Sequence, residues 1–173
     1  PFYKQDTLGI YADQAHFMYA TGGLIPLNLT FYSYYQAYPM LVQLSYTYSY
    51  LASGWEDSYL AKLIPTLLSL ACLGAVYYLA KTLYDEKSGW LAVLLLALTP
   101  LFGRWASSGY TDLPMAFYYT LAALFVWRTW VSGNLVDALL SGITLGLGAW
   151  TKNAILPAIG FWLMLMGWGW LRK

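Results

Sequence analysis

The sequence is poor in charge, because Asp, Glu, Lys and Arg make up only 10% of its 173 residues and the formal net charge is +1. This balance lacks the concentrated positive charge that marks a nucleic-acid partner. Cysteine occurs once, as Cys72, so no internal disulfide can form and thiols do not identify the compartment. The sequence also lacks a glycine-rich phosphate loop, cysteines at metal-ligand spacing and a Ser/His nucleophile pair. No signature of a soluble enzyme therefore appears.

Apolar residues are abundant instead: they make up 60% of the chain, and the mean hydropathy is +0.50. These values lie far from those of a soluble domain and indicate an integral membrane protein. The chain also has 9 Trp and 17 Tyr. Their rings favour the headgroup level of a bilayer, so we expect most of them to anchor the protein at the membrane interface.

Five uncharged stretches are predicted to be membrane-spanning helices. They cover residues 63–80, 88–103, 113–127, 138–151 and 153–171. A bilayer core requires about 20 helical residues, so the first and last stretches suffice, whereas the middle three need flanking charged residues to reach the interface. The runs show no two-residue alternation, which argues against barrel strands. The predicted fold class is all-α, a polytopic helical membrane protein with about five transmembrane helices and outward-facing interfacial helices.

The basic residues predict the orientation of these helices. One set of loops carries Lys81, Lys87, Arg128, Arg172 and Lys173, and the other carries Lys4, Lys62, Arg104 and Lys152. The first set lies in short connections, which favours the cytoplasmic side. Residues 1–58 then form an outer region, and residues 59–173 form the transmembrane module.

Two segments of the outer region are predicted to be helical. Residues 38–54 have a proline, Pro39, at their start and a glycine, Gly54, at their end, as a helix along the membrane surface would. The alternation over residues 45–50 leaves a strand open as an alternative. Residues 8–19 form the second predicted helix, ended by Gly22 and Gly23, and residues 26–37 form a Tyr-rich loop.

A short polar island at residues 101–114 places Arg104 and Asp112 between two apolar runs. A carboxylate at the edge of a bilayer is costly to keep ionised unless it meets a partner, a cation or water. We therefore expect chemistry here. Alternatively, each charged residue has no role in chemistry and only marks the end of a helix.

Several short motifs follow one another along the chain in a fixed order. They are residues 6–11 with 15–19, residues 37–41, residues 99–102, residues 109–114 and residues 147–152. This order resembles the GT-C membrane glycosyltransferases, in particular the bacterial and archaeal relatives of protein O-mannosyltransferases and of the lipid A aminoarabinose transferase. The resemblance implies transfer of a sugar from a polyprenyl-phosphate donor to a protein, lipid or glycan acceptor, on the outer face of a bacterial or archaeal plasma membrane.

The resemblance also implies roles for individual residues. An acidic residue of the first outer loop, here Asp6, is the proposed catalytic base, and a second acidic residue maps to Asp112. Basic residues near the active site bind the donor phosphate, which directs attention to Lys152. We expect Asp112 and Lys152 to face one outer cavity, with Lys152 on the lipid phosphate and Asp112 orienting the acceptor or a divalent cation. No other cofactor and no metal ligand are assigned.

The chain departs from the family pattern at two positions. Many relatives have Lys-Pro-Pro where this sequence has Ala37-Tyr38-Pro39, and Lys-Ala-Lys where it has Gln14-Ala15-His16. Two expected phosphate contacts are therefore absent. Lys152, Arg104 or His16 could supply these contacts instead; alternatively, the protein binds its donor differently or is inactive. Tyr38 stands at the altered turn. As a lone histidine, His16 is otherwise expected to be an interfacial or loop residue rather than a metal ligand.

The resemblance further predicts a span before Asp6 and a region after residue 173, so the sequence is expected to be an incomplete enzyme, inactive alone. The rival interpretation is a non-enzymatic scaffold subunit or transporter segment. In it, Arg104 and Asp112 form a structural pair or line a solute path.

Overall fold

The computed structural model describes residues 7–24 and 38–171, and every regular element in these two ranges is helical. The predicted all-α fold class is therefore confirmed. The elements, in chain order, are η1 Thr7–Ala12, α1 Asp13–Thr21, α2 Leu41–Ser53, α3 Ser58–Leu83, α4 Glu86–Ala97, α5 Pro100–Ala106, α6 Asp112–Ser132, α7 Leu135–Thr151, η4 Asn153–Ile155 and α8 Leu156–Leu171. The short turn η1 has π-helical hydrogen bonding, and η4 is a 3-10 turn.

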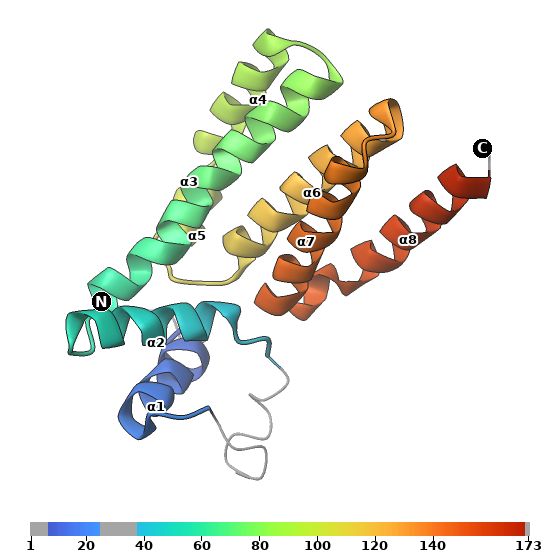
Figure 1. The fold of residues 1–173 in the computed structure, drawn as a ribbon. Coiled ribbons are helices and arrows are strands. Elements are labelled where there is room, and N and C mark those ends of the chain that lie inside the picture. The colour runs from blue at the N-terminus through green and yellow to red at the C-terminus, as the bar shows by residue number, and fades with distance from the viewer. Residues whose placement is uncertain (1–6, 25–37, 172–173) are drawn as a thin grey trace.

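The long helices run up and down, so that the connections alternate between two ends of the molecule (Figure 1). At one end, α3 turns into α4 and α6 turns into α7. At the other end lie the α5–α6 turn, the break between α7 and α8, and the N-terminal helices α1 and α2. Polar residues of the α5–α6 turn, of the α7–α8 break and of the N-terminal helices therefore lie at the same end of the molecule, although they are far apart in the sequence.

Local sequence signals fix where several of these helices begin and end. Asp57 caps α3 by accepting hydrogen bonds from the backbone N–H groups of Tyr59 and Leu60, at 2.8 and 3.1 Å. Helices α2 and α6 end at Gly54 and Gly133, which have φ of 77° and 69°. Glycine adopts this left-handed conformation without a steric penalty, so it stops a helix cleanly.

The predicted span at residues 88–103 is wrong as a single straight helix. It is divided into α4 and α5, whose axes bend by 72° at the break. Pro100 begins α5 and disfavours helical backbone at Thr99, which is extended, with φ of −71° and ψ of 116°.

By length and composition, fewer of the described helices qualify as membrane spans than the five that the sequence predicted. Within residues 7–24 and 38–171, α3 is the one helix long and apolar enough to cross a bilayer, and the bent pair α4–α5 would make a second span. Helix α7 and residues Asn153–Gly167 are apolar but shorter. The expectation of about five spans is thus not confirmed, although the five predicted stretches are helical apart from the break between α4 and α5.

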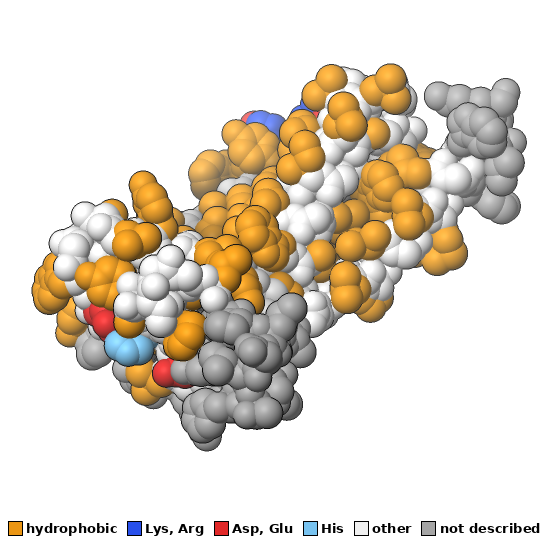
Figure 2. All heavy atoms as spheres, turned by 60° about the horizontal axis from the view of Figure 1, so that its bottom comes forward, with side chains coloured by type: hydrophobic (Ala, Val, Ile, Leu, Met, Phe, Trp, Pro, Cys, Tyr) orange, Lys and Arg blue, Asp and Glu red, His pale blue; other side chains and the backbone are white. Residues whose placement is uncertain are grey.

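The helices carry hydrophobic side chains both on their exposed surface, as expected in an apolar surrounding, and in their buried contacts. Hydrophobic side chains cover much of the face seen in Figure 2, and many Leu side chains of α3, α4 and α8 are exposed, as is Trp90 of α4. Buried apolar residues form two clusters. One joins the N-terminal helices to the start of α3, around Tyr46 and Ala61, and the other joins α6, α7 and η4 through Ala122, Leu145 and Ile155.

The predicted interfacial segments are helical in the described residues. Residues 41–53 form α2 rather than a strand, and the helix predicted over residues 8–19 corresponds to η1 followed by α1, which ends at Gly22. The predicted loop at residues 26–37 lies entirely outside the described residues.

Candidate functional site

Asp112 and Lys152 form an ion pair between the ends of two neighbouring helices. Asp112 is the first residue of α6, and Lys152 directly follows the last residue of α7. The Lys152 Nζ donates a hydrogen bond to Asp112 Oδ1 at 2.6 Å. A carboxylate at a helix N-terminus and an ammonium at a C-terminus both complement the helix dipoles. Each charge is therefore stabilised by its own helix as well as by its partner.

Close packing beneath the pair brings these helix ends together. A Cβ atom added at Gly148 of α7 would lie 2.4 Å from Ile155 Cδ1 and 3.3 Å from Tyr118 Cβ of α6. A side chain at this position would require Ile155 or α6 to shift. Lys152 then leaves the helix in an extended conformation, with φ of −159° and ψ of 133°, and its side chain reaches Asp112.

The ion pair remains open to its surroundings. The Asp112 and Lys152 side chains are 40% and 29% exposed. A second pair, Arg128 with Asp137, joins the same two helices at the opposite end, but there the Asp137 carboxylate is only 5% exposed. An external anion could thus reach Lys152, and an external hydroxyl or cation could reach Asp112, whereas Asp137 is closed off. The structure thus brings Asp112 and Lys152 together, and the outer cavity expected around them stays a prediction.

The other predicted site residues lie around this pair or apart from it. Asp6 lies outside the described residues. Tyr38 packs edge-to-face on Tyr11 with ring centroids 6.2 Å apart, and the Tyr11 hydroxyl is 3.2 Å from the hydroxyl of Thr111, next to Asp112. Arg104 is exposed near the end of α5, and its guanidinium makes no hydrogen bond or ion pair with the described residues. The structural pair of Arg104 with Asp112 is therefore not formed.

His16 contacts a carboxylate instead of the Asp112–Lys152 pair. Its Nδ1 lies 2.7 Å from Glu56 Oε1, 40 residues further along the chain. Both border a hollow of about 320 Å³ together with Asp13 and Tyr50. Burial, assisted by the nearby carboxylates of Glu56 and Asp57, raises the pKa of Tyr50 to about 12. Sequence reasoning missed the His16–Glu56 contact, because no local spacing signals it.

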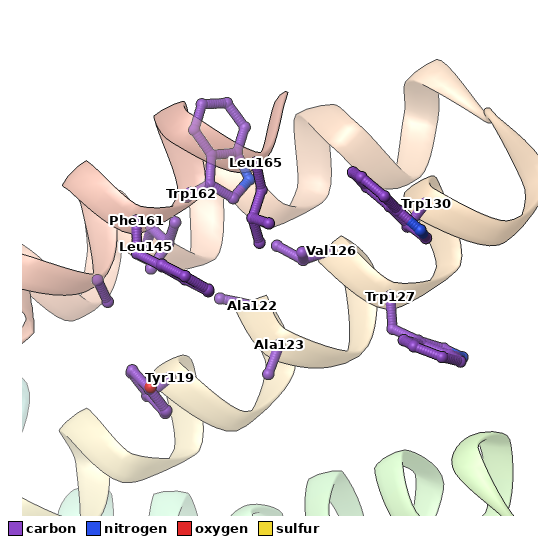
Figure 3. A pocket seen from close by; sticks show the side chains of 11 residues that line it. Tyr119, Ala122, Ala123, Val126, Trp127, Trp130, Leu145, Phe161, Trp162 and Leu165 are labelled. Atoms are coloured by element: carbon purple, nitrogen blue, oxygen red, sulfur yellow. The ribbon is translucent and has the colours of Figure 1, made fainter. Parts of the chain in front are cut away.

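An apolar groove of about 310 Å³ lies between α6, α7 and α8 (Figure 3). Its side chains are apolar or aromatic, and they come mainly from α6 and α8. They are Tyr119, Ala122, Ala123, Val126, Trp127, Trp130, Leu145, Ala158, Phe161, Trp162 and Leu165. Sequence reasoning missed this groove too, although the spacing from Asp112 to Tyr119 and on to Val126 is seven residues each time, which places all three on one face of a helix.

No described residues form a ready-made metal site: within residues 7–24 and 38–171, no three His, Cys, Asp or Glu side chains gather as metal ligands. From the sequence, Asp112 was expected to orient either the acceptor or a divalent cation. In the structure the Asp112 carboxylate contacts Lys152.

A comparison with protein families matches residues 56–173 to the family described as dolichyl-phosphate-mannose-protein mannosyltransferase. The match covers α3 to α8 and includes both residues of the ion pair. Searches of curated proteins and of solved structures returned no match.

Proposed function

The chain belongs to the dolichyl-phosphate-mannose-protein mannosyltransferase family, whose members are membrane glycosyltransferases of the GT-C type that use a polyprenyl-phosphate sugar donor, and we propose that its Asp112–Lys152 pair lies in the transfer site. The observation that carries this proposal is the accessible 2.6 Å contact between the two charges at the ends of α6 and α7. A lipid-linked donor keeps its chain in the bilayer and its phosphate at the boundary. A site for it must therefore combine charge at a helix end with an apolar surface beside it.

The proposed chemistry is attack by an acceptor hydroxyl on the anomeric carbon of the donor sugar. The new bond forms between the acceptor oxygen and this carbon, while the bond from the carbon to the phosphate oxygen breaks and its electrons go to the phosphate. A carboxylate takes the proton of the hydroxyl, and a cation stabilises the charge on the departing phosphate. We assign the cation role to Lys152 and the orientation of the acceptor, or of a divalent cation, to Asp112.

Asp6 is proposed as the general base. Its neighbour in the sequence, Thr7, is buried and donates a hydrogen bond to the backbone carbonyl of Ser108, at 3.2 Å, in the turn that precedes Asp112. This contact supports a role for the segment around Asp6 beside the pair. Arg104 is proposed as a second phosphate contact, because it is an exposed cation in the helix before the same turn. We do not give this role to His16, whose ring faces the Glu56 carboxylate.

We propose that the groove of Figure 3 receives part of the donor's polyprenyl chain. Asp112, Tyr119, Ala123, Val126 and Trp130 lie within about 40° of one line along α6, at 100° per residue. The groove therefore continues the face of α6 that begins at the ion pair. It starts about 10 Å from Asp112 and extends for about 16 Å, at 1.5 Å per residue. A chain attached to a phosphate at Lys152 would follow this face into the bilayer.

We propose that the end bearing α1, α2 and the ion pair faces outward from a bacterial or archaeal plasma membrane. Supporting this orientation, Lys81, Lys87 and Arg128 lie at the opposite end of the helices, where short basic connections indicate the cytoplasm. The acceptor would then be an exported protein, lipid or glycan.

A transfer assay tests the proposal. The full-length protein is reconstituted in vesicles with polyprenyl-phosphate mannose and an acceptor peptide rich in Ser and Thr. Lys152→Gln should lower the transfer rate by about tenfold or more, the loss typical of a hydrogen bond to a charged group. Lys81→Gln is the matched control, since Lys81 also pairs with a carboxylate, Glu86, but at the opposite end. Equal rates for the two variants would favour the scaffold interpretation.

The groove has its own test. Ala123→Trp should fill it and weaken binding of a long-chain polyprenyl phosphate, but not of a short-chain analogue. Val131→Trp, at an exposed position of α6 outside the groove, is the control. Unchanged binding of the long-chain lipid by Ala123→Trp would reject the assignment.

A further inference from the structure

We infer that Tyr46 is a positioning residue: through the turn at residues 108–111, its hydroxyl holds Asp112 in place against Lys152. This inference rests on the proposed function for its consequence on sugar transfer, but not for its consequence on the geometry of the ion pair. Tyr46 lies on α2, far in sequence from both charged residues, and no motif in the sequence pointed to it.

The hydroxyl of Tyr46 reaches directly into the turn. Tyr46 is completely buried, and its hydroxyl donates a hydrogen bond to the backbone carbonyl of Gly109 at 2.6 Å. Gly109 has φ of 80°, which is the left-handed conformation that reverses the chain after α5. The contact therefore fixes the residue at which the chain changes direction toward α6.

Two further hydroxyls hold the same turn. Thr7 donates to the carbonyl of Ser108, and the hydroxyls of Tyr11 and Thr111 lie 3.2 Å apart. Three of the four residues before Asp112 are thus held by η1 and α2. The carbonyl of Thr111 in turn accepts the N–H of Met115 at 2.9 Å, in the first turn of α6. The position of the turn therefore sets where α6 begins, and Asp112 is its first residue.

Tyr46 makes the shortest of these three contacts, and its hydroxyl remains a donor. Burial, with contributions from Tyr50 and Tyr11, raises the pKa of Tyr46 well above its usual value. A neutral phenol can donate to a carbonyl, whereas a phenolate cannot. If the contact is removed, the buried Gly109 carbonyl loses its donor. An unpaired buried carbonyl is unfavourable, so displacement of the turn becomes more favourable.

Tyr46 also belongs to the buried cluster of the N-terminal helices, so a variant must keep its ring. Tyr46→Phe removes only the hydroxyl. Thr47→Val is a matched control on the same helix, because the buried Thr47 hydroxyl bonds to the carbonyls of Ala15 and Gln43 and does not contact the turn. Both variants lose one buried hydroxyl of α2, but only the first loses the contact to the turn.

The reactivity of Lys152 measures the geometry of the ion pair without any assay of activity. The full-length protein in phospholipid vesicles is treated with a small amine-acylating reagent, and acylation of Lys152 is quantified by mass spectrometry relative to Lys81. Tyr46→Phe should raise Lys152 acylation by about fivefold, the population change expected for one lost hydrogen bond. Thr47→Val should leave it unchanged. No rise in Tyr46→Phe, or an equal rise in both variants, would overturn the inference.

Sugar transfer supplies the second readout. Tyr46→Phe should lower kcat in the wild-type background and have no further effect in an Asp112→Asn background, because both changes act through the same carboxylate. Additive losses would show that Tyr46 acts independently of Asp112 and would overturn the positioning role. If the wild-type protein transfers no mannose, the proposed function fails, while the acylation result still decides the inference.

Discussion

Gly148 offers a quantitative test of why α6 and α7 bring Asp112 and Lys152 together. An added Cβ would approach Ile155 Cδ1 to 2.4 Å and Tyr118 Cβ to 3.3 Å. Ile155 is buried in the cluster with Ala122 and Leu145, so its side chain has little space to move away. We expect Gly148→Ala to push η4 and the adjacent Lys152 away from α6.

Two opposing effects set the size of this change. Overpacking a well-packed core costs about 1–3 kcal/mol, whereas replacing glycine by alanine within a helix gains about 0.5–1 kcal/mol. The expected net loss is therefore about 0–2.5 kcal/mol. Gly146→Ala is the matched control, since it lies on the same helix and an added Cβ there meets nothing within 4 Å. This control should show the helix gain alone.

Unfolding of both variants in the same detergent measures the difference. Gly148→Ala should unfold at lower denaturant concentration than Gly146→Ala, and its Lys152 should react faster with an acylating reagent. If the two variants are equally stable and Lys152 reacts alike in both, the close contact at Gly148 does not position the ion pair, and the explanation for its geometry is wrong.

Three further predictions concern the N-terminal region and the topology. Asp6→Asn should lower transfer by about 10²–10⁴-fold, as loss of a general base does, with donor binding retained; undiminished transfer would reject this role. The folded-state pKa of Tyr50, raised to about 12 from the ordinary 10.0, contributes stability that is fully present below pH 10.0 and is lost as the pH rises toward about 12. In Tyr50→Phe, this loss of stability at alkaline pH should be absent. A dependence of stability on pH identical to that of wild type would contradict the prediction. Cysteines placed at Ser88 and Ser132 should be labelled from the opposite side of the membrane to one at Ser33, and labelling from one side would refute the topology.

Much of the helical pattern could be predicted from sequence, because apolar runs and helix-ending glycines act locally. Gly54 and Gly22 stop α2 and α1 as expected. The bend at Thr99 was missed, since the apolar run continues through it and only Pro100 marks the break. The number of spans could not be settled in this way, because helices such as α7 are apolar but shorter than a bilayer requires.

The candidate site, too, could be predicted from the sequence only in part. Asp112 and Lys152 could be singled out because a charge between apolar runs is costly and so suggests a partner. Gly148 packs closely against α6 and η4 near their direct contact, and the spacing of 40 residues carries no signal of this contact. The roles of Tyr46 and of the groove were invisible, because each depends on helices that meet only in the folded chain.

We propose that Lys152 binds the phosphate of a lipid-linked donor, and the dissociation constant of polyprenyl phosphate for the full-length protein in detergent tests this role. Lys152→Gln should remain folded, because a partly exposed ion pair contributes only about 0–1 kcal/mol to stability. It should bind the lipid about tenfold or more weakly, while Lys81→Gln binds it as wild type does. Equal affinity of Lys152→Gln and wild type would contradict the claim.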